Sequence, residues 1–149
     1  MNERLQQIAP DLVRLLHRTK PALLRAIRTA ICDAVIRRVG LDDPTIHEAL
    51  GVLSGSDDAP PALRTATEAR VEQLDLEYFE LQEAADDGRA TRDDVLNAFS
   101  RARAAAAVAT AICGNDAETT GETIYEAAAT TDDFSELDDL VDAVLSKAN

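Results

Sequence analysis

Apolar residues recur at steps of three and four along most of the chain, which is the spacing of one face of an α-helix. The clearest stripe belongs to the long periodic segment of residues 62–87. Its members are Val71, Leu74, Tyr78, Leu81 and Ala85. Leu76 and Phe79 widen this stripe, and we expect the whole set to face a core.

The next segment carries its own helix signals. Thr91 with Asp94 three positions later is a variant of the capping box, and Gly114 follows as a natural stop. The pattern predicts a helix over about residues 92–113. Its apolar face is Val95, Phe99, Ala102, Ala106 and Ala109. The short connection to the preceding segment favours a central antiparallel hairpin of residues 62–87 and 92–113.

Further helices are predicted on both sides of this hairpin. The amphipathic spacing covers residues 3–18, a helix from Pro21 ends at Gly40, and a short helix spans residues 45–53. Two short helices follow in the tail, opened by Thr119 with Glu122 and by Asp133 with Glu136. No segment alternates with period two. We therefore expect an all-α bundle of about six to seven helices, three of them long. Whether the chain reverses at Pro21 stays open.

Composition agrees with close helix packing. The 149 residues are 46% hydrophobic, but aromatic residues make up only 3% and tryptophan is absent. Alanine has the highest helix propensity and lets backbones approach closely. We expect one domain over residues 1–149, with a loop at 54–61 between helical regions 1–53 and 62–149. The Ala-rich run 102–111 could form a docking groove, but we expect it to be core.

Charge is divided unevenly along the chain. Residues 1–40 carry eight basic and three acidic side chains, whereas the whole chain has a net charge of −13. The remainder therefore carries −18. Such a molecule repels nucleic acid and anionic membranes overall, and basic protein surfaces are its natural counterparts. The first residues lack the apolar stretch of a signal peptide, so we expect a cytoplasmic protein.

An acidic helical surface is the first candidate site. We expect a small, non-catalytic binding protein that covers a basic protein partner, as immunity and antitoxin proteins do, because complementary charge speeds encounter. The candidate residues lie along the first hairpin helix and its end. They are Glu72, Glu77, Glu80, Glu83, Asp86 and Asp87. An assembly subunit is an alternative, in which the basic region of one copy meets the acidic region of another and forms a homodimer.

A metal site is the second candidate. Glu77 and Glu80 share one helix face, and Asp94 follows on the next helix, where carboxylates could hold Mg²⁺. Residues 77–96 resemble the all-α nucleotide pyrophosphohydrolases of the MazG-like group, with Thr91 where that family has a glutamate. The resemblance implies a Mg²⁺-dependent pyrophosphohydrolase as the alternative function. Our leading hypothesis needs no cofactor.

Arginine, cysteine and histidine supply weaker candidates. Arg14, Arg18, Arg25 and Arg28 follow steps of four, seven and three, and with Arg37 and Arg38 they could bind phosphates or carboxylates. We expect them instead to pair with acidic helices, within one chain or across a dimer. Cys32 and Cys113 are expected to be small buried thiols, which could pair only if their helices are neighbours. His17 and His47 lack zinc-ligand spacing and are expected to be structural.

Overall fold

The computed structural model describes residues 3–148, which form eight α-helices and contain no strand. The all-α prediction is confirmed, with one helix more than expected. In chain order the helices are α1 (Glu3–Ile8), α2 (Pro10–His17), α3 (Pro21–Val39), α4 (Pro44–Leu53), α5 (Pro61–Asp86), α6 (Arg92–Ala111), α7 (Ala117–Ala128) and α8 (Ser135–Lys147). Within residues 3–148, no helix is long and apolar enough to cross a membrane.

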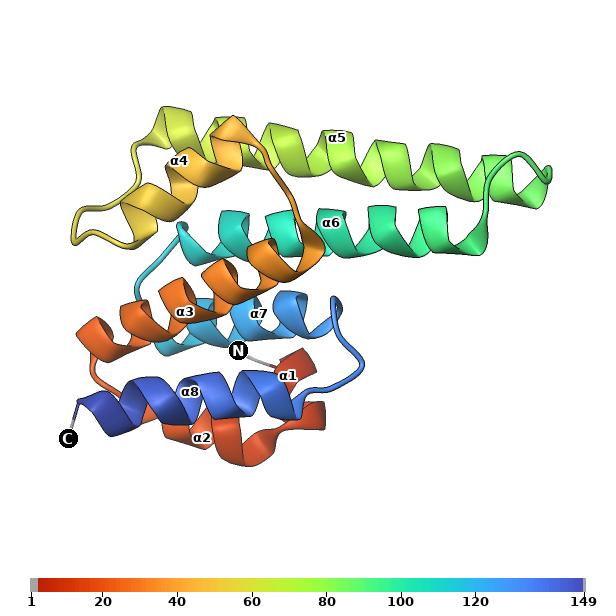
Figure 1. The fold of residues 1–149 in the computed structure, drawn as a ribbon. Coiled ribbons are helices and arrows are strands. Elements are labelled where there is room, and N and C mark those ends of the chain that lie inside the picture. The colour runs from red at the N-terminus through yellow and green to blue at the C-terminus, as the bar shows by residue number, and fades with distance from the viewer. Residues whose placement is uncertain (1–2, 149) are drawn as a thin grey trace.

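The additional helix arises at Pro10. A single helix was expected over residues 3–18, but the chain breaks after Ile8, and Pro10 occupies the first turn of α2. Proline has no backbone N–H and disfavours helical geometry in the residue before it, so a helix begins there more readily than it continues. The chain turns again between α2 and α3, and α3 runs back across the molecule (Figure 1). The arginine row is therefore divided between separate helices.

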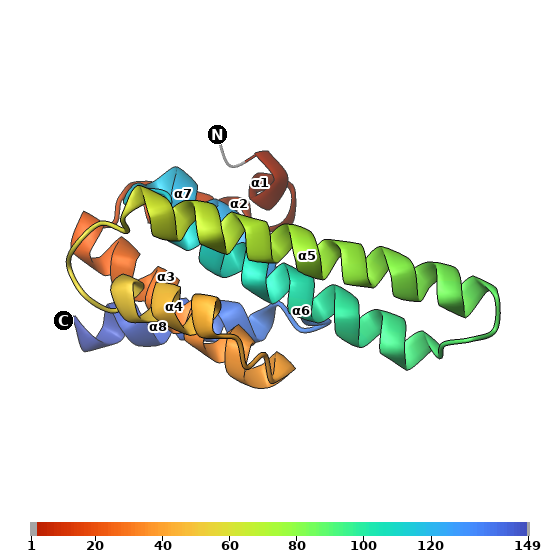
Figure 2. The same cartoon turned by 90° about the horizontal axis from the view of Figure 1, so that it is seen from above.

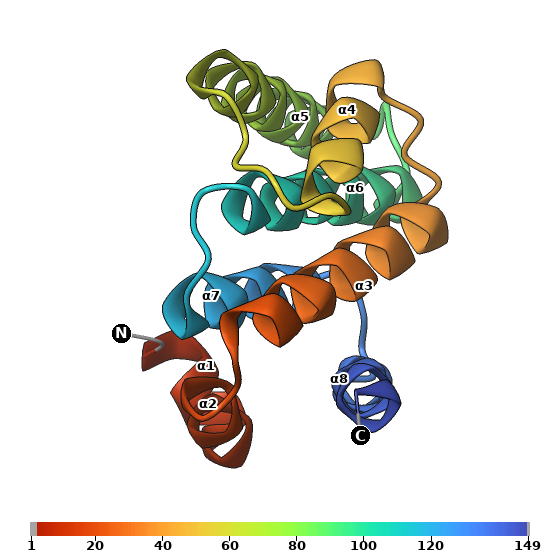
Figure 3. The same cartoon turned by 90° about the vertical axis from the view of Figure 1, so that its left-hand side faces the viewer.

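The helices stack in layers. Viewed from the side, α4 and α5 lie above α6, followed by α3 with α7 and then by α2 with α8 (Figure 3). Helix α3 is central and contacts α6, α7 and α8. Its Ile27, Ile31 and Val35 are fully buried. The second half of α6 supplies a run of buried small residues against α3 and α7: Ala104, Ala105, Ala107, Val108 and Ala111.

The predicted hairpin of α5 and α6 is present, and its far end stands clear of the other helices (Figures 1 and 2). We call residues 76–101 the arm and the rest of the described chain, including the inner halves of α5 and α6, the body. Within the arm only Val95 is buried. A two-helix unit covers just one side of each helix, so the arm has little core of its own.

The helix ends follow local signals in part. Gly40 ends α3 with a φ of 68°, and Thr91 and Asp94 form the predicted capping box of α6. The tail helices begin elsewhere than expected. Asp116 caps α7 by accepting a hydrogen bond from Thr119 N, and α8 starts at Ser135 after Phe134. Asp116 lies three residues before Thr119, which is the spacing that an N-cap side chain needs to reach a free N–H group.

Candidate functional site

The acidic residues predicted to bind a partner are all exposed on α5 and at its end. They do not form one surface. Helical spacing places Glu72 and Glu83 on the same stripe, while Glu77 and Glu80 lie on another side of α5. Asp86 ends the helix and Asp87 follows it. The acidic groups therefore spread over the exposed side of the outer half of α5 and do not line a single stripe.

Apolar side chains interrupt this acidic surface. Leu76 is 57% exposed, Phe79 is 59% exposed, and Leu96 on α6 is 49% exposed. The expectation that Leu76 and Phe79 belong to the core is wrong, because α6 covers only the opposite side of α5. The steps of four, three and four place Glu72, Leu76, Phe79 and Glu83 in one line. This line, which we call the outer stripe, has two apolar residues between two carboxylates.

Aromatic residues gather beside the outer stripe. A hollow of about 380 Å³ is lined by Tyr78, Phe79, Phe99 and Tyr125, four of the five aromatic residues in the chain. The ring centroids of Tyr78 and Phe79 are 5.3 Å apart, as are those of Tyr78 and Phe99. The sequence stripe identified Tyr78 and Phe99, but nothing local indicated that Tyr125 of α7 would join them.

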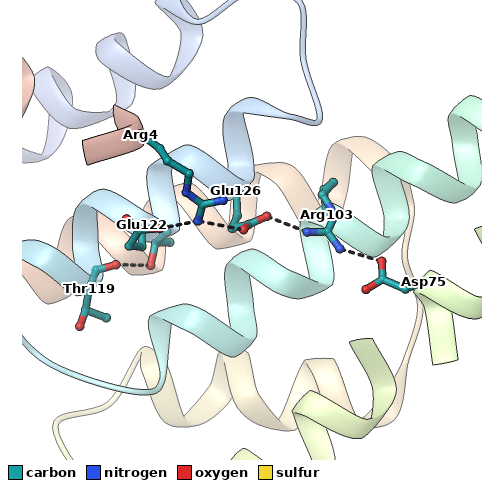
Figure 4. Close-up of polar contacts among 7 residues, drawn as sticks. Arg4, Asp75, Arg103, Thr119, Glu122 and Glu126 are labelled. Carbon is teal, nitrogen blue, oxygen red and sulfur yellow. Dashed lines mark hydrogen bonds and ion pairs between the residues drawn. The ribbon is translucent and has the colours of Figure 1, made fainter. Parts of the chain in front are cut away.

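An ion-pair network connects this hollow to the body (Figure 4). Arg103 of α6 lies 2.6 Å from Asp75 of α5 and 3.0 Å from Glu126 of α7. Arg4 of α1 lies 2.6 Å from Glu122 and 3.6 Å from Glu126. The network holds three carboxylates against two guanidinium groups, so the base of the arm keeps a net negative charge.

Arg4 also forms part of the aromatic hollow. Its guanidinium carbon lies 4.3 Å from the centroid of the Tyr125 ring, within the range of a cation–π contact. The hydrogen bond to Glu122 is the main cause that raises the pKa of Arg4, and it outweighs the opposing effect of burial. The site therefore already accommodates one guanidinium group between an aromatic ring and carboxylates.

A second hollow continues along the same seam of α5 and α6. It measures about 300 Å³ and lies between Glu68, Val71 and Glu72 on α5 and small residues of α6. Those small residues include Ala106 and Ala109, each 8% exposed. The Ala-rich run thus supplies core on one side and a shallow groove on another. Glutamates border this groove as well.

The cysteines differ from each other. Cys32 is buried as expected, but Cys113 is exposed at the end of the groove, and both thiols are free. Cys113 follows the last turn of α6, where the neighbouring helices no longer cover it. Burial raises the pKa of Cys32 to about 12. Burial also raises the pKa of Cys113. Neither thiol is activated as a nucleophile.

The metal candidates are not brought together. Within residues 3–148, no group of three or more His, Cys, Asp or Glu side chains is arranged to hold a metal ion. Asp94 is engaged elsewhere, because its carboxylate accepts the hydrogen bond of Thr91 N at 3.1 Å. The Mg²⁺ site suggested for Glu77, Glu80 and Asp94 therefore has no structural basis.

Only part of the basic region pairs with acidic groups of the same chain, because Arg25 and Arg28 donate to neutral acceptors. Of the arginine row, only Arg38 pairs with a carboxylate of another helix within residues 3–148. Arg38 binds Glu136, Arg37 lies 3.2 Å from Asp33, and Arg14 pairs with Asp11. His47 Nε2 lies 3.1 Å from Asp42 Oδ1. His17 is exposed at the end of α2.

No protein-family model matches the chain, and no curated protein or solved structure shows significant similarity to it.

Proposed function

We propose that the protein is a non-catalytic binding protein that uses the arm to cover a basic protein partner. The observation that carries this proposal is the pair of exposed side chains Leu76 and Phe79, set between Glu72 and Glu83 on a hairpin that projects from the body. Exposed apolar residues with a charged border are typical of protein interaction sites.

Charge defines the class of partner. The arm carries seven acidic and three basic side chains, and further carboxylates lie at its base. A partner segment that presents lysine or arginine next to apolar side chains would match the outer stripe in both respects. Complementary charge would speed its encounter and fix its orientation, and burial of Leu76 and Phe79 would supply the affinity.

The hollows beside the outer stripe give the partner a place to anchor. An apolar or aromatic side chain would fit the aromatic hollow next to Phe79, and a basic side chain would reach the carboxylates at its rim. The groove over Ala106 and Ala109 extends this surface along α5 and α6. An inhibitor of a basic protein, such as an immunity or antitoxin protein, would use a surface of this kind.

Affinity capture from extracts of the native cell tests the proposal. The double variant Leu76→Ser/Phe79→Ser should lose the partner, with binding reduced about tenfold or more. The control is Ile8→Ser, because Ile8 is 54% exposed but lies on α1, outside the arm. A basic protein retained by wild type and by the control, lost from the double variant and eluted by salt, is the expected result.

A second pair of variants isolates the charge contribution. Glu72→Gln/Glu83→Gln should weaken capture and reduce its salt dependence. Glu48→Gln/Asp139→Asn removes the same charge from exposed positions of the body and should leave capture unchanged. Equal capture by all variants, an acidic partner or no partner would contradict the proposal. Self-association through Leu76 and Phe79 would show that the partner is a second copy of this chain and not a different, basic protein.

A further inference from the structure

A cavity of about 320 Å³ lies in the body, away from the arm, where α3 meets the end of α6 and the start of α5. Three of its lining residues are arginines, Arg25, Arg28 and Arg64, and one is an aspartate, Asp58. A positive cavity is unexpected in a chain with a net charge of −13. The net charge of the cavity lining is therefore positive, whereas that of the arm is negative.

Arg28 forms the inner wall of this cavity and is 0% exposed. Its guanidinium donates to three neutral acceptors: Ala111 O at 3.1 Å, Thr120 Oγ1 at 2.9 Å and Asn115 Oδ1 at 3.2 Å. Within the described residues 3–148 it forms no ion pair with a carboxylate. A guanidinium has five N–H donors, so its hydrogen-bonding capacity is only partly used.

The lack of a counter-ion has an energetic consequence. A buried charge is costly unless a group of opposite charge pairs with it. The carbonyl of Ala111, at the negative end of the α6 dipole, compensates the guanidinium only in part. Burial lowers the pKa of Arg28, and the nearby Arg25 lowers it further, while Cys32 and the carboxylate of Asp116 offset this only in part. An anion that reached this guanidinium would remove the imbalance.

Arg25 and Arg64 are placed to help Arg28 bind an anion. Arg25 is held rigidly, because it donates to the carbonyl oxygens of Val52, Leu53 and Asp57. Arg64 lies in the first turn of α5, where the helix dipole also favours an anion. No carboxylate of the described chain forms an ion pair with Arg64. None of the three guanidinium groups forms an ion pair within residues 3–148, and Arg25 alone donates to three carbonyl acceptors.

A larger and mostly apolar groove adjoins the cavity. It measures about 1060 Å³, runs between α3 and α4, and shares Arg25, Leu53, Asp58 and Asn115 with the cavity. Much of its lining consists of small or aliphatic residues, namely Ala22, Ala26, Ala30, Leu50 and Gly51. A ligand with an acid group in the cavity would therefore find room for an apolar body next to it.

We propose that the body binds an amphipathic organic acid, with its anionic group on Arg28 and Arg64 and its apolar part in the groove between α3 and α4. Asn115 acts as the gate. Its amide oxygen covers Arg28, and its Nδ2 donates to Asp58 Oδ1 at 3.0 Å at the exposed rim. The incoming acid group takes the place of the amide oxygen as the acceptor on Arg28.

Calorimetric titration with octanoate, 1-octanol and inorganic phosphate tests both parts of the ligand. Octanoate should bind at least about tenfold more tightly than either of the others, since it alone has an anionic group and an apolar body. No binding of octanoate would overturn the proposal. Equal affinity for octanol would exclude the role of the arginines, and equal affinity for phosphate would exclude the role of the groove.

The role of Arg28 is tested most directly by exchanging two neighbouring side chains without changing the net charge. Asn115→Asp/Asp58→Asn keeps the net charge and the hydrogen bond between the two residues, but it moves the carboxylate from the rim onto Arg28. This variant should bind octanoate at least about tenfold more weakly than wild type, because Arg28 then carries its own counter-ion. Unchanged affinity in the folded variant would overturn the assignment to Arg28.

A second variant tests the groove without altering any charge. A Cβ atom added to Gly51 has no heavy atom within 4 Å, so Gly51→Leu should fold and extend into the groove. It should weaken octanoate binding about tenfold or more, while Gly51→Ala should retain it. Equal binding by Gly51→Leu and wild type would show that the ligand does not lie along α4. Circular dichroism of each variant confirms that the helices are intact.

Discussion

The helices of the body bury most of their large apolar residues, whereas those of the arm expose several of them. In the body, α3 is surrounded by α6, α7 and α8, and its buried residues are aliphatic apart from Arg28 and Cys32. In the arm, α5 and α6 pack mainly against each other, and large apolar side chains face outward. The arm therefore exposes apolar and acidic groups that a partner can cover. The body buries its apolar groups and encloses a positively charged cavity.

Truncation of matched apolar residues should separate the two regions most clearly. Ile31→Ala in α3 should lower the free energy of unfolding by about 3–5 kcal/mol, because Ile31 is fully buried between helices. Leu81→Ala in the arm removes the same number of carbon atoms from a half-buried position and should cost about 1 kcal/mol. Urea denaturation followed by circular dichroism measures both values. Equal losses would show that the arm is packed as tightly as the body.

The connection between the two regions depends on Arg103. Arg103→Met should lower the free energy of unfolding by about 1–3 kcal/mol, because it leaves Asp75 and Glu126 without their shared cation. Amide exchange should become faster in residues 76–86, while exchange in α3 changes little. Arg101→Met is the control, since Arg101 is exposed two residues earlier on α6. If both variants exchange alike, the network does not anchor the arm.

The sequence predicted best what short-range interactions determine. Thr91 and Asp94 cap α6 and Gly40 ends α3, because these signals act within one turn of helix. The hairpin follows from two periodic segments and a short connection. The break at Pro10 was also local, but the amphipathic spacing on both sides of it concealed it.

Contacts between distant segments were beyond the sequence pattern. Tyr125 lines the same hollow as Tyr78 and Phe99 only because α7 packs against α6, and no sequence spacing encodes that arrangement. Arg28 belonged to a row that could equally have been exposed. Its burial depends on acceptors more than 80 residues away in the chain. Sequence patterns therefore singled out Tyr78, Phe99 and Arg28. Their neighbours Tyr125 and Arg64 join them only through the fold, which forms the hollow and the cavity.

The pH dependence of stability should reflect the buried carboxylate of Asp43 in the body. Burial acts against the charged form of Asp43, but the hydrogen bond from Ile46 N and the pair with Arg70 outweigh it, so its pKa is lowered. A carboxyl whose folded pKa is below its unfolded pKa stabilises the fold above the unfolded value. That stabilisation is lost as pH falls through the folded pKa.

Asp43→Asn tests this directly, since asparagine can still cap α4. The variant should lose about 1–2 kcal/mol of unfolding free energy near neutral pH. The difference from wild type should shrink below about pH 4, as Asp43 of the wild type becomes protonated. Urea denaturation at several pH values measures this. Asp42→Asn, at the exposed neighbouring position, should differ from wild type by less than about 0.5 kcal/mol. A difference for Asp43→Asn that stays constant with pH would contradict the assignment.

Replacement of a glycine by alanine should have the smallest effect on stability, and its sign should differ between the two regions. Gly88 at the tip of the arm has a φ of 76°, which strains any residue with a Cβ atom, so Gly88→Ala should destabilise the protein by about 1 kcal/mol. Gly51 lies within α4 and has open space around its Cα, so Gly51→Ala should stabilise it by about 0.5–1 kcal/mol through helix propensity. Thermal unfolding of both variants measures the contrast. If Gly88→Ala were neutral, the turn between α5 and α6 would not need the left-handed conformation. The hairpin would then be held together by the seam of its two helices alone.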